Sequence, residues 1–453
     1  DGFLLQFCYI HGYLRVASPT PPANAARQDG AGFGRSVWLL GVWGSREGAK
    51  MTIGRDAGVP AIAQSYGAFG APSTPAVTDP RAFFSVWRSQ PLAGTREVLD
   101  GVVAPEHRGP SPALSALLAS WPGAWYWADD AKSRLVLIQG TVPARPERWL
   151  WHGALLALTV LCTLGAGAVL QSRWVPTVHP GFWGAVRSVV EFAEFALQGG
   201  WRTLLPGWEF AAPLLSILLV HELGHYWTAR RYAIDVSPPY FLPVPPNLSP
   251  IGGLGAYIRL RSPIYDRRQL LDVGAAGPLA GFVVAIGVLI WGYQLSHRME
   301  IPLAGSASFV LFAGKPAFLG DSFLTHQLRE WLLPGTGAVL LSPQAFAGWV
   351  GLFITGLNLL PLSQLDGGHV LYGLLGRRQK TIGLLCVGVL LLLAQRAPMW
   401  YLWVVLTFAI GGGRWTHPEV VLPERPVLAA GRWTGFFCIV VFLLTFVPVP
   451  FLR

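Results

Sequence analysis

Long apolar stretches separated by short polar segments fill the C-terminal two thirds of the chain. Several of them approach the length of about 20 residues that a helix needs to cross a hydrocarbon core. The stretches cover about residues 149–171, 210–232, 270–295, 345–362, 381–395, 398–412 and 434–449. This pattern predicts an α-helical polytopic membrane protein with about six to seven transmembrane helices.

Three connecting segments have patterns of their own. Residues 181–204 are semi-apolar but contain Arg187 and Glu191, which predicts an amphipathic segment on the membrane surface. Residues 237–262 are rich in Pro and Gly and then alternate apolar with polar positions, which predicts an extended loop and an edge strand or hairpin at the membrane. The segment between 295 and 345 predicts a loop with weakly apolar patches.

The pattern divides the chain into three parts. Residues 1–148 form an N-terminal extramembrane region of unknown function, and residues 149–415 form the membrane core. Residues 416–453 add a C-terminal loop and one more transmembrane helix. Within the first part, residues 18–34 predict a linker, and residues 37–42 and 134–139 predict strands. Residues 1–16 lack a basic leading region, so no signal peptide is predicted there.

Composition agrees with a membrane protein. Hydrophobic residues make up 52% of the 453 residues and charged residues only 13%, about half the share usual in soluble proteins. The net charge is +10, but the arginines flank the apolar spans. The sequence contains no basic stripe interleaved with aromatics, so nucleic-acid binding is not predicted. The distribution of the arginines predicts that the N-terminal region is on the cytoplasmic side. The four cysteines show no CxxC spacing, so we interpret them as apolar residues rather than disulfides or thiolate ligands.

The second span carries a His-Glu-x-x-His motif. His221 and His225 are four residues apart, so a helix places both imidazoles on one face, as two zinc ligands require. Glu222 is rotated by about 100° and can reach a water at the metal without being a ligand. Zinc lowers the pKa of that water, and Glu222 can pass its proton to a leaving amine.

A catalytic zinc needs a third protein ligand and one open position. The candidate is Asp366, which follows the helix-breaking Pro361 and precedes two glycines. His369 is a rival, either as a ligand or as a group that orients the carboxylate. Asn358 supplies an amide that can hold a substrate carbonyl or its oxyanion. Asp272 is interpreted as a charge at the start of the third span rather than a ligand. Five other histidines near span ends and loops are interpreted as interfacial residues: His152, His179, His297, His326 and His417.

Three motifs in order resemble the site-2 protease family of intramembrane zinc metalloproteases. They are HELGH at 221–225, GAAGPLAG at 274–281 and NLLPLSQLDGGH at 358–369, and the resemblance covers about residues 145–415. The sequence between the first two is most similar to the subgroup found in bacteria, with relatives in chloroplasts. Gly281 departs from the Asn common at the end of the second motif, and residues 1–144 match nothing in the family.

The resemblance implies a metalloendopeptidase that cuts membrane-spanning proteins within or near the bilayer. It implies one zinc per chain, held by His221, His225 and Asp366, with Glu222 as general base and Asn358 in contact with the substrate. It also implies that residues 237–262 form a sheet that pairs with an unwound substrate segment. The expected location is a bacterial cytoplasmic membrane.

Three other hypotheses fit less well. A non-catalytic binding protein on the same scaffold does not need all four residues of the zinc site, and this chain has all four. A transporter is expected to show matched halves with paired broken helices, whereas the polar residues of this chain concentrate in one place. A zinc protease of another family needs a Glu as third ligand, and the glutamates after the motif, Glu300, Glu330, Glu419 and Glu424, lie outside the spans.

Overall fold

The computed structural model of the chain describes residues 79–91, 97–139, 147–177, 179, 181–300, 307–415 and 417–452. Within them the chain is mostly helical, and three helical stretches are long and apolar enough to cross a membrane. They are α2 (Trp149–Leu170), the stretch Trp201–Arg231 that ends in α5 (Trp208–Arg231), and α6 (Arg267–Gln294). These coincide with the first three predicted spans. The linker and strand expected at 18–34 and 37–42, and Cys8, lie outside the described residues.

Four shorter helices coincide with the remaining apolar stretches. They are α8 (Pro343–Asn358), α10 (Gln379–Leu393), α11 (Met399–Ile410) and α12 (Ala429–Thr445). Helix α8 is apolar because it is the core of the bundle: every residue after its first is buried, and it packs against both α5 and α6. Six or seven membrane crossings therefore remain a prediction, while a mostly helical bundle is established.

A small sheet domain precedes the helices. Its four strands are β1 (Phe84–Pro91), β2 (Glu97–Val103), β3 (Ala124–Trp127) and β4 (Arg134–Gln139), in the order β1-β2-β4-β3 with all neighbours antiparallel. The strand predicted at 134–139 is confirmed as β4. Helix α1 (Pro112–Ser120) begins after Ser111, whose hydroxyl accepts from the Leu114 amide, and packs Leu114 onto the sheet.

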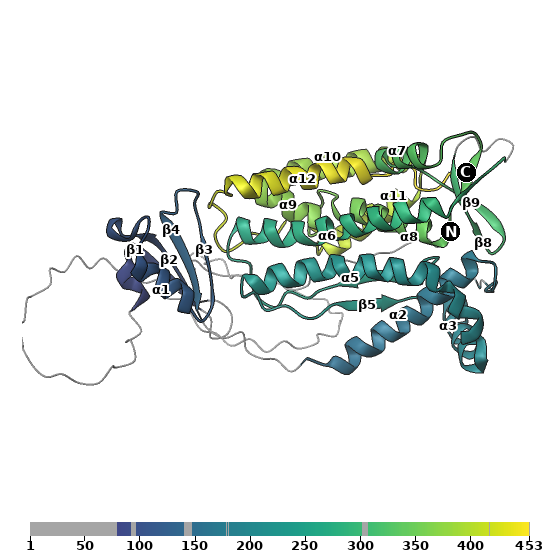
Figure 1. The fold of residues 1–453 in the computed structure, drawn as a ribbon, viewed down its shortest axis with the longest axis horizontal. Coiled ribbons are helices and arrows are strands. Elements are labelled where there is room, and N and C mark those ends of the chain that lie inside the picture. The colour runs from purple at the N-terminus through teal and green to yellow at the C-terminus, as the bar shows by residue number, and fades with distance from the viewer. Residues whose placement is uncertain are drawn as a thin grey trace, which may run out of the picture.

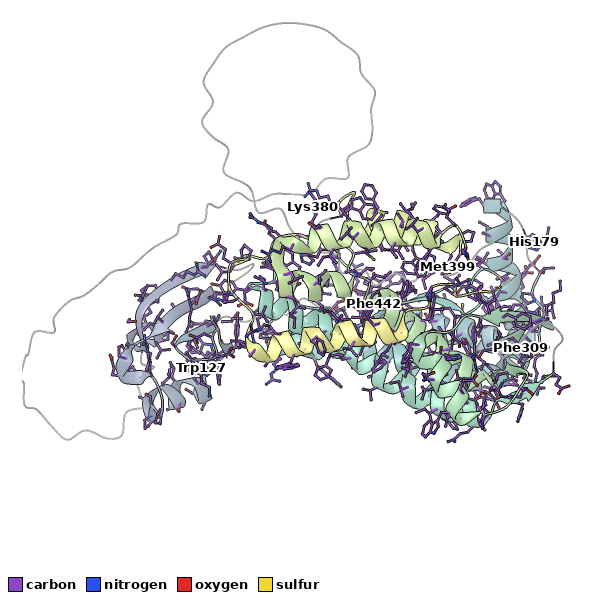
Figure 2. The ribbon with its side chains drawn as sticks, turned by 90° about the horizontal axis from the view of Figure 1, so that it is seen from above. Trp127, His179, Phe309, Lys380, Met399 and Phe442 are labelled. Carbon is purple, nitrogen blue, oxygen red and sulfur yellow. The ribbon has the colours of Figure 1, made fainter. Side chains whose placement is uncertain are left out.

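The sheet domain lies at one end of the elongated helical bundle (Figure 1). Trp127 of β3 lies where the domain meets the helices, and Phe309 lies at the opposite end of the molecule (Figure 2). Tyr126 and Val136 pack in one buried cluster with Tyr232 and Ile264, residues that flank the ends of α5 and α6. The junction is thus part of a hydrophobic core rather than a loose contact.

A buried cluster of charges completes this junction. Arg425 contacts Asp100 of β2, and its Nη1 donates to Asp266 Oδ2 over 3.0 Å. The Tyr126 hydroxyl also donates to Asp266, over 2.7 Å, and Asp266 caps the start of α6. Burial alone raises the pKa of Asp100, but Arg425 and the other neighbouring guanidinium groups outweigh burial and hold the pKa below its usual value.

Replacing Arg425 by Ala is expected to loosen the sheet domain. The change leaves Asp100 and Asp266 buried without their shared cation, which typically costs about 3 kcal/mol or more. Amides of β3 should then exchange hydrogen roughly a hundredfold faster. Arg432→Ala, an exposed neighbour, is the control and should change exchange little. Equal exchange in the two variants would contradict the role given to Arg425.

The same cluster predicts a pH dependence. The pKa of Asp100 is lower in the folded protein than in the unfolded chain. Its contribution to the free energy of unfolding is therefore complete at pH values above the unfolded pKa of about 3.9. It is lost as the pH falls through the lower folded value. Acid should therefore release the sheet domain, and the Arg425→Ala protein should show less of this pH dependence.

The segment predicted to pair at the membrane forms a two-stranded hairpin. Strands β5 (Tyr240–Pro243) and β6 (Gly253–Tyr257) are antiparallel, and β5 packs along α2. His152 of α2 fixes this contact, with Nδ1 3.1 Å from the Pro239 carbonyl oxygen. At the far end of the bundle, α3 (Gly181–Phe195) exposes apolar side chains such as Trp183, as expected of an interfacial segment.

The prediction of a loop between residues 295 and 345 is wrong. The chain there forms a second sheet from β7 (His297–Met299), β8 (Ser308–Phe312), β9 (Lys315–Leu319) and β10 (Ala338–Leu340), together with helix α7 (Phe323–Leu332). Strands β8 and β9 are joined by Ala313 and Gly314, both with positive φ, which is the geometry of a tight hairpin turn. Ala is an uncommon residue in such a turn, so the hairpin is hard to recognise from the residue pattern.

Candidate metal and catalytic site

Helix α5 presents the His-Glu-x-x-His motif to the interior of the bundle. His221, Glu222 and His225 are each about 3% exposed. The four-residue spacing stacks the two imidazoles on one face, with ring centroids 4.9 Å apart, and their Nε2 atoms lie 3.2 Å apart. Two nitrogen atoms that approach so closely are both potential ligands for one cation.

Asp366 reaches this pair from the first residue of α9 (Asp366–Leu375). Pro361 separates α8 from α9, and the two glycines after Asp366 let the new helix pack closely on this connection. A Cβ on Gly367 would lie 2.0 Å from the Leu359 carbonyl oxygen, and one on Gly368 would lie 2.3 Å from that of Ser363. The glycines are therefore a steric requirement for bringing the carboxylate to the histidines.

The three side chains match the geometry of a zinc site. Asp366 Oδ2 lies 3.3 Å from His221 Nε2 and 3.3 Å from His225 Nε2. Ligands about 2.0–2.1 Å from a tetrahedral zinc are themselves about 3.3 Å apart. Asp366 Oδ2 is also buried without a hydrogen-bond donor among the described residues. A buried carboxylate oxygen facing two ring nitrogens is suited to a cation.

The orientation of His225 is fixed by a residue outside the trio of His221, His225 and Asp366. Its Nδ1 donates to the Val273 carbonyl oxygen over 2.7 Å. This bond places the ring proton on Nδ1 and leaves the Nε2 lone pair directed at Asp366 and His221. Such a hydrogen bond is the usual support of a metal-ligating histidine.

Three glycines of α6 make room for the site. A Cβ on Gly277 would lie 2.1 Å from His225 Nε2, one on Gly281 would lie 3.1 Å from His221 Cβ and Nδ1, and one on Gly274 would lie 2.7 Å from His369 Cβ. Close packing of α5 on α6 through small residues is typical of membrane helices. Gly281, the departure from the family pattern, thus lies against a proposed ligand, and a larger residue there would have to share space with the His221 ring.

The structure brings Asn358 and Glu222 to the same place. Asn358, the last residue of α8, has its Nδ2 3.2 Å from His221 Nε2. Glu222 is buried beside the trio and interacts electrostatically with His225. Every residue singled out from the sequence for this site therefore lies within one buried cluster.

His369 and His417 form a contact that the sequence did not reveal. Their Nδ1 and Nε2 atoms lie 2.6 Å apart, and both rings are buried. The interpretation of His417 as an interfacial residue is wrong, because the chain after α11 folds back under α9. His369 does not belong to the trio, which favours Asp366 as the third ligand and gives His369 a place beside it.

The interpretation of Asp272 is also wrong. Helix α6 begins at Arg267 with Asp266 as its cap, so Asp272 lies past the first turn. Its carboxylate accepts from the Tyr232 hydroxyl and pairs with Arg268. Asp272 ties α6 to the end of α5, a role that depends on a tertiary contact.

Comparison with known proteins agrees with this site. The family model of Peptidase family M50 matches residues 209–394, which include α5, α6, α8 and the trio. Residues 209–394 of this chain therefore belong to peptidase family M50, the site-2 protease family.

The proteins similar to this chain include plant proteins that are named as zinc metalloproteases. The chain is 31% identical over 248 residues to "Probable zinc metalloprotease EGY2, chloroplastic" of Arabidopsis thaliana, which covers 54% of this chain and 42% of the relative. It is 29% identical over 324 residues to "Probable zinc metalloprotease EGY1, chloroplastic" of the same plant, covering 66% and 54%. The chain thus spans about half or less of the length of these relatives. No solved structure matches it.

Proposed function

We propose that this chain is an intramembrane zinc metalloprotease that hydrolyses peptide bonds of membrane-spanning proteins within or near the bilayer. The observation that carries the proposal is the buried trio His221, His225 and Asp366, with equal spacings of about 3.3 Å and Glu222 beside it. Membership of the matched residues in family M50 supports the same chemistry.

His221, His225 and Asp366 would hold one zinc ion per chain. When bound, zinc supplies Lewis-acid chemistry: it polarises the scissile carbonyl and lowers the pKa of water. Glu222 is placed to take the proton of the attacking water and to pass it to the leaving amine. The Val273 carbonyl keeps the His225 ring in the tautomer that the site needs.

The surroundings of the site suit a membrane substrate. Apolar helices enclose it, and the hairpin of β5 and β6 packs between α2 and α5, where an unwound substrate segment can pair with it. We propose that the chain is a multi-pass integral membrane protein with its sheet domain on the cytoplasmic side. A bacterial cytoplasmic membrane remains the proposed location, and the relatives named above are chloroplast proteins.

The direct test is cleavage of a model single-span membrane protein by the purified chain in lipid nanodiscs. The proposal expects one cut in or beside the span, abolished by a zinc chelator and restored by zinc. A zinc-loaded protein that cleaves no member of a panel of single-span proteins would contradict it and favour a binding role.

Asn358→Ala should lower kcat by about a hundredfold without removing zinc. Its amide lies beside the trio and is placed to hold the substrate carbonyl as charge develops on it, and loss of one such donor typically costs about 10²–10³ in rate. Steady-state kinetics and zinc content of the variant are the measurements. A variant with normal kcat would assign Asn358 to packing alone.

A further inference from the structure

We propose that the outer edge of β3 is a docking strand for the extended extramembrane segment of a membrane-anchored substrate. The proposal rests on the function proposed above. It concerns a groove of about 850 Å³ between β3, the C-terminal end of α5, the first half of α6 and the start of α12.

Strand β3 is an edge strand, since β4 is its one partner in the sheet of the described residues. The Ala128 amide donates to the Arg134 carbonyl oxygen over 2.8 Å and continues the β3–β4 register. Alternation along an antiparallel ladder then turns the backbone groups of Trp125 and Trp127 to the opposite edge, toward the groove.

One of these groups is already in use. Arg268 of α6 donates to the Trp127 carbonyl oxygen and holds the strand in place. The N–H and C=O of Trp125 have no hydrogen-bond partner in the part of the chain that the structure describes, and the Trp125 side chain is 41% exposed. Unpaired strand edges are the surfaces on which extended peptides add as a further strand.

The floor of the groove identifies the kind of occupant. It is made by Ala275, Ala276 and Leu279 of α6, a helix long and apolar enough to cross a membrane. Ala276 directly precedes Gly277, the glycine that faces His225. The groove therefore runs from an apolar helix at the level of the metal site to a polar strand edge. A partner that fits both ends is a polypeptide that leaves the bilayer beside α6.

Two basic side chains at the groove are available to pair with an acidic segment. The aspartates at its rim are engaged: Asp129 accepts from the Ser133 and Arg134 amides, Asp130 accepts from the Ala429 amide, and Asp272 pairs with Arg268. Lys132 and Arg231 line the groove with no ion pair among the described residues. An extended segment with acidic side chains would supply the missing partners.

The test uses a model single-span substrate with an acidic extended segment next to its span, and a shortened form without that segment. A photo-crosslinker at Trp125 in the Glu222→Gln protein should capture the long substrate. The same crosslinker at Val86, an exposed residue on the opposite edge strand β1, should not. Crosslinking does not depend on cleavage, so failure of the docking strand can be told apart from failure of the proposed function.

Substitutions at Trp125 provide a second, kinetic test. Trp125→Pro removes the N–H that faces the groove and leaves the bonds to β4, so KM for the long substrate should rise about tenfold with kcat within twofold. Trp125→Ala keeps that N–H and should raise KM less. Shortening the substrate should raise KM as much as Trp125→Pro does, and the two changes together should add nothing further.

Capture at Trp125 but not at Val86, with the rise in KM, supports the docking strand. Absence of capture at Trp125, or equal capture at both edges, overturns it, whether or not cleavage occurs. Should Trp125→Pro lose its fold, shown by loss of zinc, the crosslinking result decides alone.

Discussion

Replacing Glu222 by Gln is expected to lower kcat at least about a thousandfold while the protein keeps its zinc. Gln has nearly the shape of Glu but cannot take a proton from water, and a positioned general base contributes about 10²–10⁴ in rate. Glu222 is one residue from His221 on α5 but does not belong to the trio that fits a metal. The measurement is zinc content beside the rate of cleavage of a single-span substrate.

Glu209→Gln is the matched control. Glu209 is in the first turn of the same helix and accepts a hydrogen bond from Gln171, away from the metal site. This variant should cleave within about twofold of wild type. Substantial cleavage by Glu222→Gln, or equal loss in both variants, would remove Glu222 from its assigned role.

Gly277→Ala is expected to lower zinc affinity at least about a hundredfold. The added Cβ would lie 2.1 Å from His225 Nε2 and 2.4 Å from its Cδ2, far inside van der Waals contact. The ring cannot turn aside without breaking its bond to the Val273 carbonyl. Displacing a ligand in this way costs at least as much as losing a supporting hydrogen bond, which typically lowers affinity 10–100-fold.

Gly287→Ala is the control on the same helix. A Cβ at Gly287 meets nothing within 4 Å, so this variant should keep its zinc and its activity. Zinc titration of the two chelator-treated proteins gives the comparison. Equal zinc affinity would show that the α5–α6 contact is not as tight at Gly277 as the structure has it.

The sequence predicted those parts of the site that depend on local periodicity. A spacing of four on an apolar helix is sufficient to place His221 and His225 on one face. Asp366 follows more than a hundred residues later, and its selection relied on the breaker Pro361, the two glycines and the family resemblance. The structure adds the steric reason: Gly367 and Gly368 allow α9 to start against the connection from α8.

The features that the sequence did not predict are tertiary contacts. Arg425 bonds to Asp100, which lies 325 residues away, and no pattern along the chain pairs them. His417 comes to His369 because a loop folds back. The hairpin of β8 and β9 turns at Ala313 and Gly314 rather than at a more common turn sequence. In each case a long-range contact or an uncommon residue decides the structure.

Zinc X-ray absorption spectroscopy of the purified wild-type chain tests whether His221, His225 and Asp366 bind one zinc ion. We predict stoichiometric zinc with two imidazole nitrogens and a carboxylate oxygen at about 2.0–2.2 Å. Absence of zinc, or a first shell with sulfur at about 2.3 Å, would contradict it.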